Sequence, residues 1–353
     1  MGAAAPEPVA GAPVMADVAR LAGVSHQTVS RAINGSPHIR PATRERVEAA
    51  IRQLGYRPNP AARALVTKRS RLIGIVVTEG GLFGPASIQR TVEEAARDAG
   101  YFAGSVSLRE VTRQSLSDAF DHLLRQSVEG IVMIAAEHQA LDLVAERDPG
   151  VPLVVVEGDL SRGRFAVGVD QFRGAYEATR HLIDLGHRTI AHLTGPAGWT
   201  EAEAREQGWR QALADAGLAA SVLHRGDWSP ARGYRVGLEL GHNREVTAVF
   251  SANDQMAIGL LRALHEIGRA VPGDVSVVGF DDTPEAAFLI PPLTTVRQDF
   301  PEVGRRAIGV LHAAIVGEPE DLERLIDPVL VVRSSTSEAA GPRPGGSPRG
   351  GDS

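Results

Sequence analysis

The sequence contains no cysteine, few aromatic residues and no long apolar run. Without cysteine the chain has no disulfide framework, no thiolate nucleophile and no Cys-based zinc site. No stretch approaches the roughly 18 apolar residues that a membrane helix needs, so we expect no membrane partner. Residues 1–13 are rich in Ala and Pro and lack the positive charge of a signal peptide. These absences suit a cytoplasmic protein, which is the location we expect.

The motifs of common enzyme classes are missing as well. There is no G-x-S-x-G nucleophile elbow, no G-x-x-x-x-G-K phosphate loop and no G-x-G-x-x-G after a predicted strand. His181, His187 and His192 are spaced by six and five residues, which suits neither one helix face nor a metal pair. We therefore predict a protein that is not an enzyme and that has no catalytic residue, metal site or cofactor.

Acidic residues are scarce at the N-terminus. Residues 1–71 hold 11 of the 37 Lys and Arg but only 4 of the 43 Asp and Glu, a formal charge of +7 in a chain whose total is −6. A basic N-terminal region followed by an acidic remainder predicts that a polyanion binds at the N-terminus.

Residues 14–34, VMADVARLAGVSHQTVSRAIN, predict two short helices joined by a tight turn at Gly23-Val24-Ser25. Residues 41–54 predict a third helix, with Pro41 tolerated in its first turn. The apolar positions at helical spacing are Val18, Leu21 and Ala22, then Val29 and Ile33, then Val47, Ala50, Ile51 and Leu54. Because each stripe is narrow, the three helices must bury their stripes against one another. Such a unit places its second helix in the DNA major groove.

The second helix carries polar side chains that can hydrogen-bond to DNA. Arg pairs with guanine, and Gln or Asn with adenine, at about 1–3 kcal/mol of discrimination per good bidentate pair. The candidate DNA-binding residues of this region are Ser25, His26, Gln27, Thr28, Ser30, Arg31 and Asn34. The alternative is a small three-helix domain with a solvated polar face. The basic charge of this region favours DNA.

A segment of unusual composition, residues 59–70, follows the third helix. Asn59 is a candidate N-cap, Pro60 a candidate first helical residue, and the AARAL that follows is a good helix former. About two turns of helix are marginal alone in water, so we expect this segment to order only when it is bound. Leu65 among basic residues is typical of an apolar wedge in the minor groove. An ordinary interdomain linker is the alternative.

Three stretches carry a resemblance to a known family: AGVSHQTVSRAIN, NPAARAL, and SANDQMAIG through VSVVGFDDTPEAAFLIPPLTTVRQDF. From about residue 14 to about residue 335 the chain resembles the lactose/galactose repressor family of transcription regulators. The resemblance implies that His26, Gln27 and Arg31 read bases. It also implies that a hinge with Asn59, Ala62 and Leu65 contacts the centre of a palindromic operator.

From residue 72 onward, short β-branched runs alternate with helical patterns. The runs are 72–77, 130–135, 152–158, 189–195, 247–253 and 275–282. Continuous apolar strands separated by helices predict parallel sheets covered on both faces. About 265 residues exceed one comfortable core, so we predict two doubly wound α/β lobes. The family resemblance implies lobes like those of periplasmic sugar-binding proteins, with a ligand in the cleft at the carboxyl ends of the strands.

Polar and aromatic side chains follow these strands. A sugar needs planar groups that donate and accept hydrogen bonds in pairs, and an aromatic face for its C–H patches. The candidate effector-binding residues are Leu82, Pro85, Glu157, Arg205, Trp228, Asn253, Asp281, Gln298 and Phe300. Asn253 and Asp281 have an alternative role as helix caps or turn residues, and Trp228 as a surface anchor. The resemblance favours inducer contacts.

The predicted domains are a disordered tail at 1–13, a helix-turn-helix domain at 14–58, a hinge at 59–70, a two-lobed core at 71–336 and a disordered tail at 337–353. Residues 337–353 lack the leucine heptads that make tetramers in one member of the family that the chain resembles, so we expect a homodimer. The predicted function is a DNA-binding repressor released from its operator by a small sugar, with a galactoside favoured. The alternatives are a regulator that depends on a corepressor or a phosphocarrier protein, and a sugar-binding protein without a regulatory role.

Overall fold

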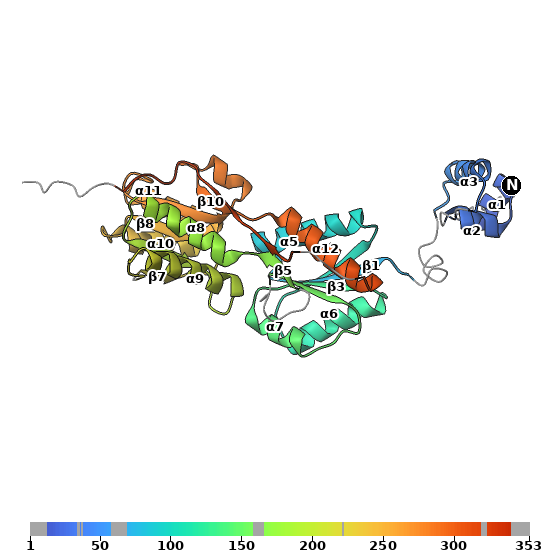
Figure 1. Cartoon of the computed structure of the whole chain (residues 1–353), viewed down its shortest axis with the longest axis horizontal. Helices are drawn as coiled ribbons and strands as arrows, with labels where there is room; N and C mark the ends of the chain where they lie inside the picture. Colours follow the sequence, from blue (N-terminus) through green and yellow to red (C-terminus); the bar gives the residue numbers. More distant parts are fainter. Residues whose placement is uncertain are drawn as a thin grey trace, which may run out of the picture. The chain divides into compact units, whose positions relative to one another are not determined.

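A computed structural model describes residues 13–33, 36, 38–57, 69–157, 166–220, 222–318 and 323–339. The chain divides into two compact units at the boundary between Ser70 and Arg71 (Figure 1). The predicted DNA contacts at Asn34, Asn59, Ala62 and Leu65 lie outside the described residues. So do most of the predicted hinge and nearly all of both predicted tails.

The first unit consists of three helices, as the sequence predicts. They are α1 (Met15–Ala22), α2 (His26–Ile33) and α3 (Pro41–Leu54). Gly23 ends α1 with a φ of 63°, a left-handed conformation that glycine adopts without a steric cost. Val18, Val29 and Val47, one from each helix, are fully buried at the centre of the core. The tight turn at Gly23 therefore brings the apolar stripes of α1 and α2 together.

One residue of the predicted core is on the surface. Leu21 is 45% exposed, and Ala19 is buried instead. Successive side chains are about 100° apart around a helix, so Ala19 and Leu21 lie on opposite sides of Val18. The face that α1 buries runs through Val18, Ala19 and Ala22. The helical spacing of apolar residues predicted this helix correctly, but it placed Leu21 instead of Ala19 at the edge of the buried face.

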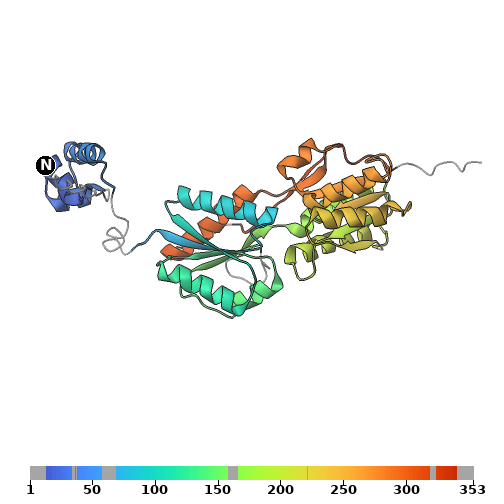
Figure 2. The ribbon, with the colours of Figure 1, turned by 180° about the vertical axis from the view of Figure 1, so that it is seen from behind.

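The second unit contains two lobes, each built on a six-stranded sheet. In the first lobe the strand order is β11-β5-β4-β3-β1-β2, and all the strand pairs are parallel. The strands are β1 (Leu72–Thr78), β2 (Phe102–Leu108), β3 (Ile131–Ile134), β4 (Leu153–Val156), β5 (Ala166–Val169) and β11 (Leu325–Ile326). Helices α5 (Phe83–Asp98) and α12 (Phe300–Val316) cover one face, and α6 (Arg113–Arg125) and α7 (His138–Ala145) cover the other (Figures 1 and 2).

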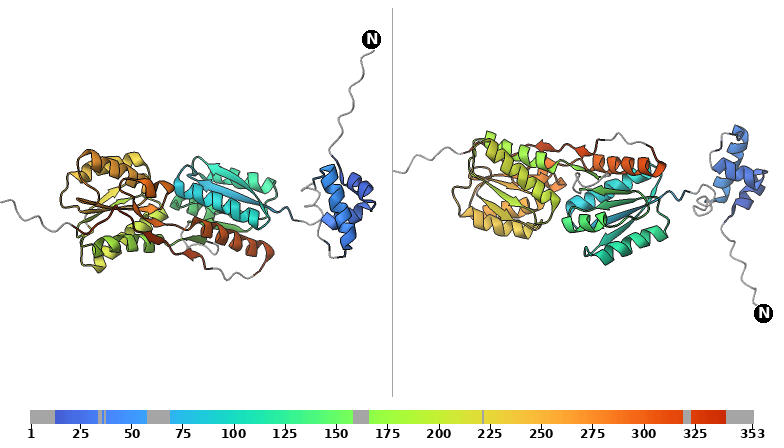
Figure 3. Two further views of the ribbon diagram at one scale, coloured as in Figure 1. Left: turned by 90° about the horizontal axis from the view of Figure 1, so that it is seen from above. Right: turned by 60° about the horizontal axis from the view of Figure 1, so that its bottom comes forward.

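The second lobe repeats this architecture with the strand order β12-β10-β9-β8-β6-β7. Its strands are β6 (Ile190–Thr194), β7 (Leu223–Arg225), β8 (Ala248–Ser251), β9 (Ser276–Asp281), β10 (Thr294–Arg297) and β12 (Val329–Val331). Its helices are α8 (Gln171–Asp184), α9 (Thr200–Asp215), α10 (Pro230–Gly241), α11 (Asp254–Glu266) and the 3-10 helix η1 (Pro284–Phe288). The pair α8 and α9 and the pair α10 and α11 lie on opposite faces of this sheet (Figure 3).

The chain passes between the lobes at three places, from β5 to α8, from β10 to α12 and from β11 to β12. The carboxyl ends of the parallel strands in both lobes face the boundary between them. A strand that enters the second lobe from this boundary must run the other way, which is why β12 is antiparallel to β10. The predicted pair of doubly wound lobes is therefore confirmed, with one antiparallel edge strand added.

Close packing of α10 against α11 gives a prediction about stability. A Cβ atom on Gly259 would overlap the backbone carbonyl oxygen of Pro230. We expect Gly259→Ala to lower the free energy of unfolding by about 1–3 kcal/mol, the usual range for overpacking. Gly104→Ala is the control, because no atom lies within 4 Å of its added Cβ. Urea denaturation measures both, and equal stability of the two variants would contradict this packing.

Candidate functional site

A cavity lies between the two lobes of the second unit, at the carboxyl ends of the strands. All nine of the candidate effector-binding residues line it: Leu82, Pro85, Glu157, Arg205, Trp228, Asn253, Asp281, Gln298 and Phe300. The structure thus brings together residues that are more than 200 positions apart in sequence.

Both lobes contribute to this cavity. Leu82 and Pro85 lie at the start of α5, Glu157 follows β4, and Phe300 begins α12. The second lobe supplies Arg205 from α9, Trp228 after β7, Asn253 after β8 and Asp281 from the end of β9. The lining also includes Phe83, Trp199 and Glu201, which were not among the candidates.

Arg205 is the central cation of the cavity. Its side chain is 3% exposed, and its Nε donates a hydrogen bond of 2.9 Å to Oε1 of Gln171. One terminal nitrogen donates to the carbonyl oxygen of Ala252, and the other lies 4.0 Å from Oδ1 of Asp281. The guanidinium carbon lies 3.9 Å from the ring centroid of Phe280, a cation–π contact. These contacts hold the guanidinium plane in one orientation.

A chain of hydrogen bonds links the acidic residues of the two lobes. Gln171 Nε2 donates to Oε2 of Glu157 and to Oε1 of Gln298, both at 2.9 Å. Gln298 Nε2 in turn donates to Oδ1 of Asp281 at 2.7 Å. Gln171 was not a candidate, because no strand was predicted before it and so no strand end pointed to it. The signal available in the sequence was the pair Asp170-Gln171, which follows the short apolar run Ala166–Val169.

Burial changes the protonation of the two acidic side chains at the ends of this chain. Burial, with a smaller contribution from the nearby Glu201, raises the pKa of Glu157 to about 8. Burial also raises the pKa of Asp281, an effect that exceeds the opposing attraction of Arg205. A neutral carboxyl group can both donate and accept a hydrogen bond. Glu157 is therefore suited to pair with a hydroxyl group at neutral pH.

Three candidates, Asn253, Asp281 and Trp228, have alternative roles as helix caps, turn residues or a surface anchor. Asn253 is the N-cap of α11, because its Oδ1 accepts a 2.9 Å hydrogen bond from the Met256 amide, and it also lines the cavity. Asp281 lies at the end of β9, and it accepts a hydrogen bond from Gln298 in the cavity wall. Trp228 is only 5% exposed, so it is not a surface anchor. Within the described residues its Nε1 has no hydrogen-bond partner.

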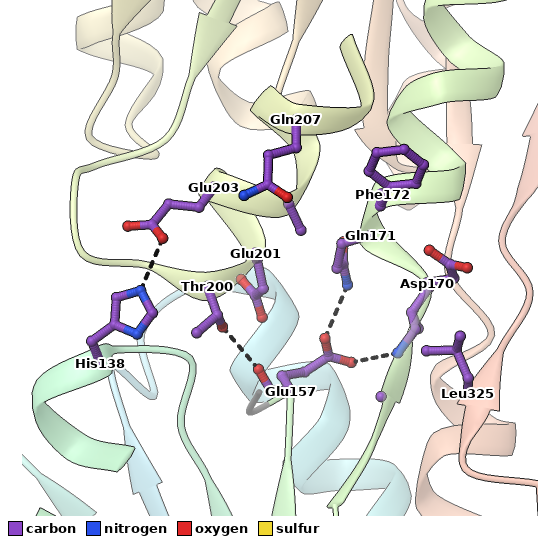
Figure 4. A pocket seen from close by; sticks show the side chains of 13 residues that line it. His138, Glu157, Asp170, Gln171, Phe172, Thr200, Glu201, Glu203, Gln207 and Leu325 are labelled. Carbon is purple, nitrogen blue, oxygen red and sulfur yellow. Dashed lines mark hydrogen bonds and ion pairs between the residues drawn. The ribbon is translucent and has the colours of Figure 1, made fainter. Parts of the chain in front are cut away.

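The lobes also contact each other beside the cavity (Figure 4). Glu137 pairs with Trp199 in an antiparallel bridge, the His138 amide donates to the Gly198 carbonyl at 3.0 Å, and the Thr200 amide donates to the Ala136 carbonyl at 2.8 Å. Nε2 of His138 lies 2.9 Å from Oε2 of Glu203. Figure 4 shows this pair at the edge of a second hollow. Glu157 and Glu201 line both the cavity and this hollow.

The described candidates for DNA contact lie on or next to α2 in the first unit. Ser25, His26, Gln27 and Arg31 are exposed, and Thr28 and Ser30 are partly exposed. The Ser25 hydroxyl accepts a 3.2 Å hydrogen bond from the Thr28 amide and lies 2.9 Å from the Thr28 hydroxyl, so this pair caps the helix. His26, Gln27 and Arg31 leave α2 with a polar, exposed face.

Within the described ranges, no group of three or more His, Cys, Asp or Glu residues is arranged to hold a metal ion. The helices of these ranges include none with the length and apolar character of a membrane span.

Comparisons with known proteins agree with this architecture. The family of bacterial regulatory proteins of the lacI type matches residues 14–59, and a periplasmic binding protein-like domain matches residues 179–336. The lactose operon repressor of Escherichia coli (strain K12) is 34% identical over 336 residues, which cover 93% of this chain and 92% of that repressor. The chain belongs to the lacI family of bacterial transcription regulators, and the predicted family is confirmed.

Other relatives, which have different names, show a similar sequence identity to this chain. The ribose operon repressor of Escherichia coli (strain K12) is 35% identical, covering 91% of this chain and 99% of its own. The regulator CelR of Thermobifida fusca is 37% identical, covering 92% of this chain and 98% of its own. A lac repressor dimer bound to operator and an anti-inducer has a TM-score of 0.82 at 33% identity, covering 94% of this chain and all of that chain. A CelR–cellobiose complex has a TM-score of 0.67 at 33% identity, covering 92% and 99%.

The raised pKa of Glu157 gives a prediction about stability and pH. The folded protein keeps a proton on Glu157 up to about pH 8, whereas an ordinary Glu loses it near 4.5. Between these values the folded state binds more protons than the unfolded state, so ionisation of Glu157 lowers the free energy of unfolding as pH rises. The glutamine in the variant Glu157→Gln has no proton to lose. We expect the Tm of Glu157→Gln, relative to the unsubstituted chain, to rise between pH 6 and pH 9.

Glu94→Gln is the matched control, because Glu94 is a half-exposed carboxylate on α5 with a surface partner, Arg90. Its Tm difference from the unsubstituted chain should stay constant over the same range. A constant difference for Glu157→Gln as well would contradict the raised pKa.

Proposed function

We propose that this regulator is a repressor that binds a palindromic operator through α2 and releases it when a small sugar occupies the cavity between the lobes. A galactoside is the favoured inducer. The observation that supports the proposal most is the convergence of nine dispersed side chains on one cavity with paired polar groups and aromatic walls. Such a lining matches the alternating hydroxyl groups and C–H patches of a sugar ring.

The DNA-binding half of the proposal rests on α2 and on charge. Exposed His26, Gln27 and Arg31 offer hydrogen bonds to base edges, and the excess of basic residues before Leu72 attracts phosphates. We further propose a homodimer, so that two copies of α2 meet two half-sites about one helical turn apart. Residues 59–70, with Asn59, Ala62 and Leu65, are the proposed minor-groove hinge.

The inducer half rests on coupling between two sites. If a sugar prefers a lobe arrangement in which the operator is bound less tightly, operator affinity falls by the coupling free energy. The same coupling must weaken sugar binding when the operator is present. We propose that Arg205, Asp281, Asn253 and Glu157 bond to the sugar hydroxyl groups and that Trp228 and Phe300 cover its apolar face. Leu82, Pro85 and Gln298 complete the contact.

A thermal-shift panel with the full chain tests the ligand class. The ligands are lactose, allolactose, galactose, ribose, cellobiose, glucose 6-phosphate and a purine base. A ligand at 100 times its Kd stabilises the folded state by about 2.7 kcal/mol, which is readily measured. A shift with galactosides alone supports the favoured inducer. A shift with another sugar keeps the repressor and changes the inducer, and a shift with the purine alone would replace the inducer by a corepressor. No shift with any ligand would contradict a sugar site.

Two variants should separate DNA binding from sugar binding. Arg31→Ala should weaken binding to duplexes selected from a randomised pool by about tenfold or more, the loss of one base-reading pair. Its thermal shift with sugar should remain. Asp281→Asn should bind the duplex normally and fail to release it with sugar. Asn is preferred to Ala here because φ of Asp281 is 114°, which Asn tolerates better.

Fluorescence anisotropy of a labelled duplex measures both effects. Arg52→Ala, an exposed Arg near the end of α3, is the control for Arg31. Loss of sugar binding in Arg31→Ala, or ordinary release in Asp281→Asn, would overturn the proposed division of roles.

A further inference from the structure

Gln171 holds a position that none of the proposed sugar contacts shares. It is the first residue of α8, directly after the chain passes from the first lobe to the second. Gln171 is 6% exposed, and it does not line the cavity that holds the nine candidate effector-binding residues. Any effect of Gln171 on a sugar in that cavity must therefore act through the side chains that it bonds.

The carboxamide of Gln171 bonds three groups that do line the cavity. Both of its N–H groups are used, one on Oε2 of Glu157 and one on Oε1 of Gln298, at 2.9 Å each. Its Oε1 accepts from Nε of Arg205, also at 2.9 Å. Glu157 belongs to the first lobe, Arg205 to the second, and Gln298 to the segment that passes between them. Figure 4 shows the Glu157 contact at the lobe boundary.

No other neutral side chain of similar size presents two donors and one acceptor in one plane, except Asn, which is one methylene shorter. The orientation of Arg205 depends on this acceptor. With Nε bound to Gln171 and one terminal nitrogen bound to the Ala252 carbonyl, the remaining nitrogen is directed toward Asp281. Loss of the Gln171 acceptor would free the guanidinium plane to rotate.

Folding of α8 does not need the Gln171 side chain. The helix is capped by Asp170, whose Oδ1 accepts a 2.8 Å hydrogen bond from the Arg173 amide. The carboxamide of Gln171 thus serves the site rather than its own helix.

We propose that Gln171 is a positioning residue of the effector site, which fixes Glu157 and Arg205 from opposite lobes in the geometry that binds the sugar. This inference rests on the proposed function, because it assumes that the cavity is a sugar site. In this role Gln171 affects the affinity for the sugar without direct contact with the sugar.

The test uses the full chain and calorimetric titration with the sugar of the panel that gives the largest thermal shift. Gln171→Met keeps the length of the side chain and removes all three hydrogen bonds. We expect it to weaken sugar binding by about tenfold to a hundredfold, since two of the lost bonds involve ionisable groups. Its affinity for the selected duplex without sugar should remain unchanged. Gln211→Met is the control, because Gln211 is exposed and bonds to Asp215 on the same helix.

A double-mutant cycle distinguishes positioning from general packing. Gln171→Met removes the donor that bonds to Glu157, so its effect on sugar binding should be smaller in the Glu157→Ala background, where that acceptor is already absent, than in the unsubstituted chain. A purely structural role of Gln171 would give equal losses in both backgrounds and would overturn the inference.

Two further outcomes distinguish failure of this inference from failure of the proposed function. Equal sugar affinity of Gln171→Met and the unsubstituted chain would overturn the inference alone. Failure of the unsubstituted chain to bind any sugar of the panel would overturn the proposed function first.

Discussion

The geometry of the second unit depends on the burial of one positive charge. Arg205 lies at the boundary between the lobes, where removal of an ion from water costs several kcal/mol unless acceptors replace the lost water. The start of α8 supplies an amide oxygen, the end of β8 a carbonyl oxygen and the end of β9 a carboxyl group. These three elements must therefore converge on α9. Their convergence creates the walls of the cavity.

The same arrangement explains why the site needs both lobes. Gln171 links Glu157 to Arg205 by hydrogen bonds, and Asp281 is bonded by Gln298 from the segment between β10 and α12. A change in how the lobes meet would alter these bonds together. Strand β1 begins at Leu72, next to the boundary with the DNA-binding unit, and ends at Thr78, shortly before Leu82 in the cavity wall. This strand is a direct covalent path from the cavity to that boundary.

Much of this fold was predictable, because a long segment with a periodic or continuously apolar pattern indicates a helix or a strand directly. The three helices of the first unit and six of the strands, β1, β3, β4, β6, β8 and β9, followed from helical spacing and apolar runs. Strands β7, β11 and β12 are only two or three residues long, β5 contains a glycine, and β2 is a partly exposed edge strand, so neither length nor continuous apolarity marks them. Leu21 was misplaced because a helix of eight residues has too few turns to define both edges of its buried face.

The site was predictable where a candidate followed a recognised strand. Asn253, Asp281 and Glu157 are of this kind, and the other candidates came from side-chain chemistry and from the family resemblance. Gln171 was missed because it follows β5, a strand of four residues with a glycine in it. Trp199 and Glu201 were missed because they precede Arg205 on the same helix start, where sequence spacing does not tell which side chains face a cleft.

Reciprocal coupling between the two units is the central claim, and paired titrations test it most directly. The affinity for a selected operator duplex is measured with and without saturating sugar, and the affinity for the sugar is measured with and without saturating duplex. The account predicts that each ligand weakens the other by the same factor, because one coupling free energy governs both. An operator affinity that saturating sugar leaves unchanged, or that it increases, would contradict the account.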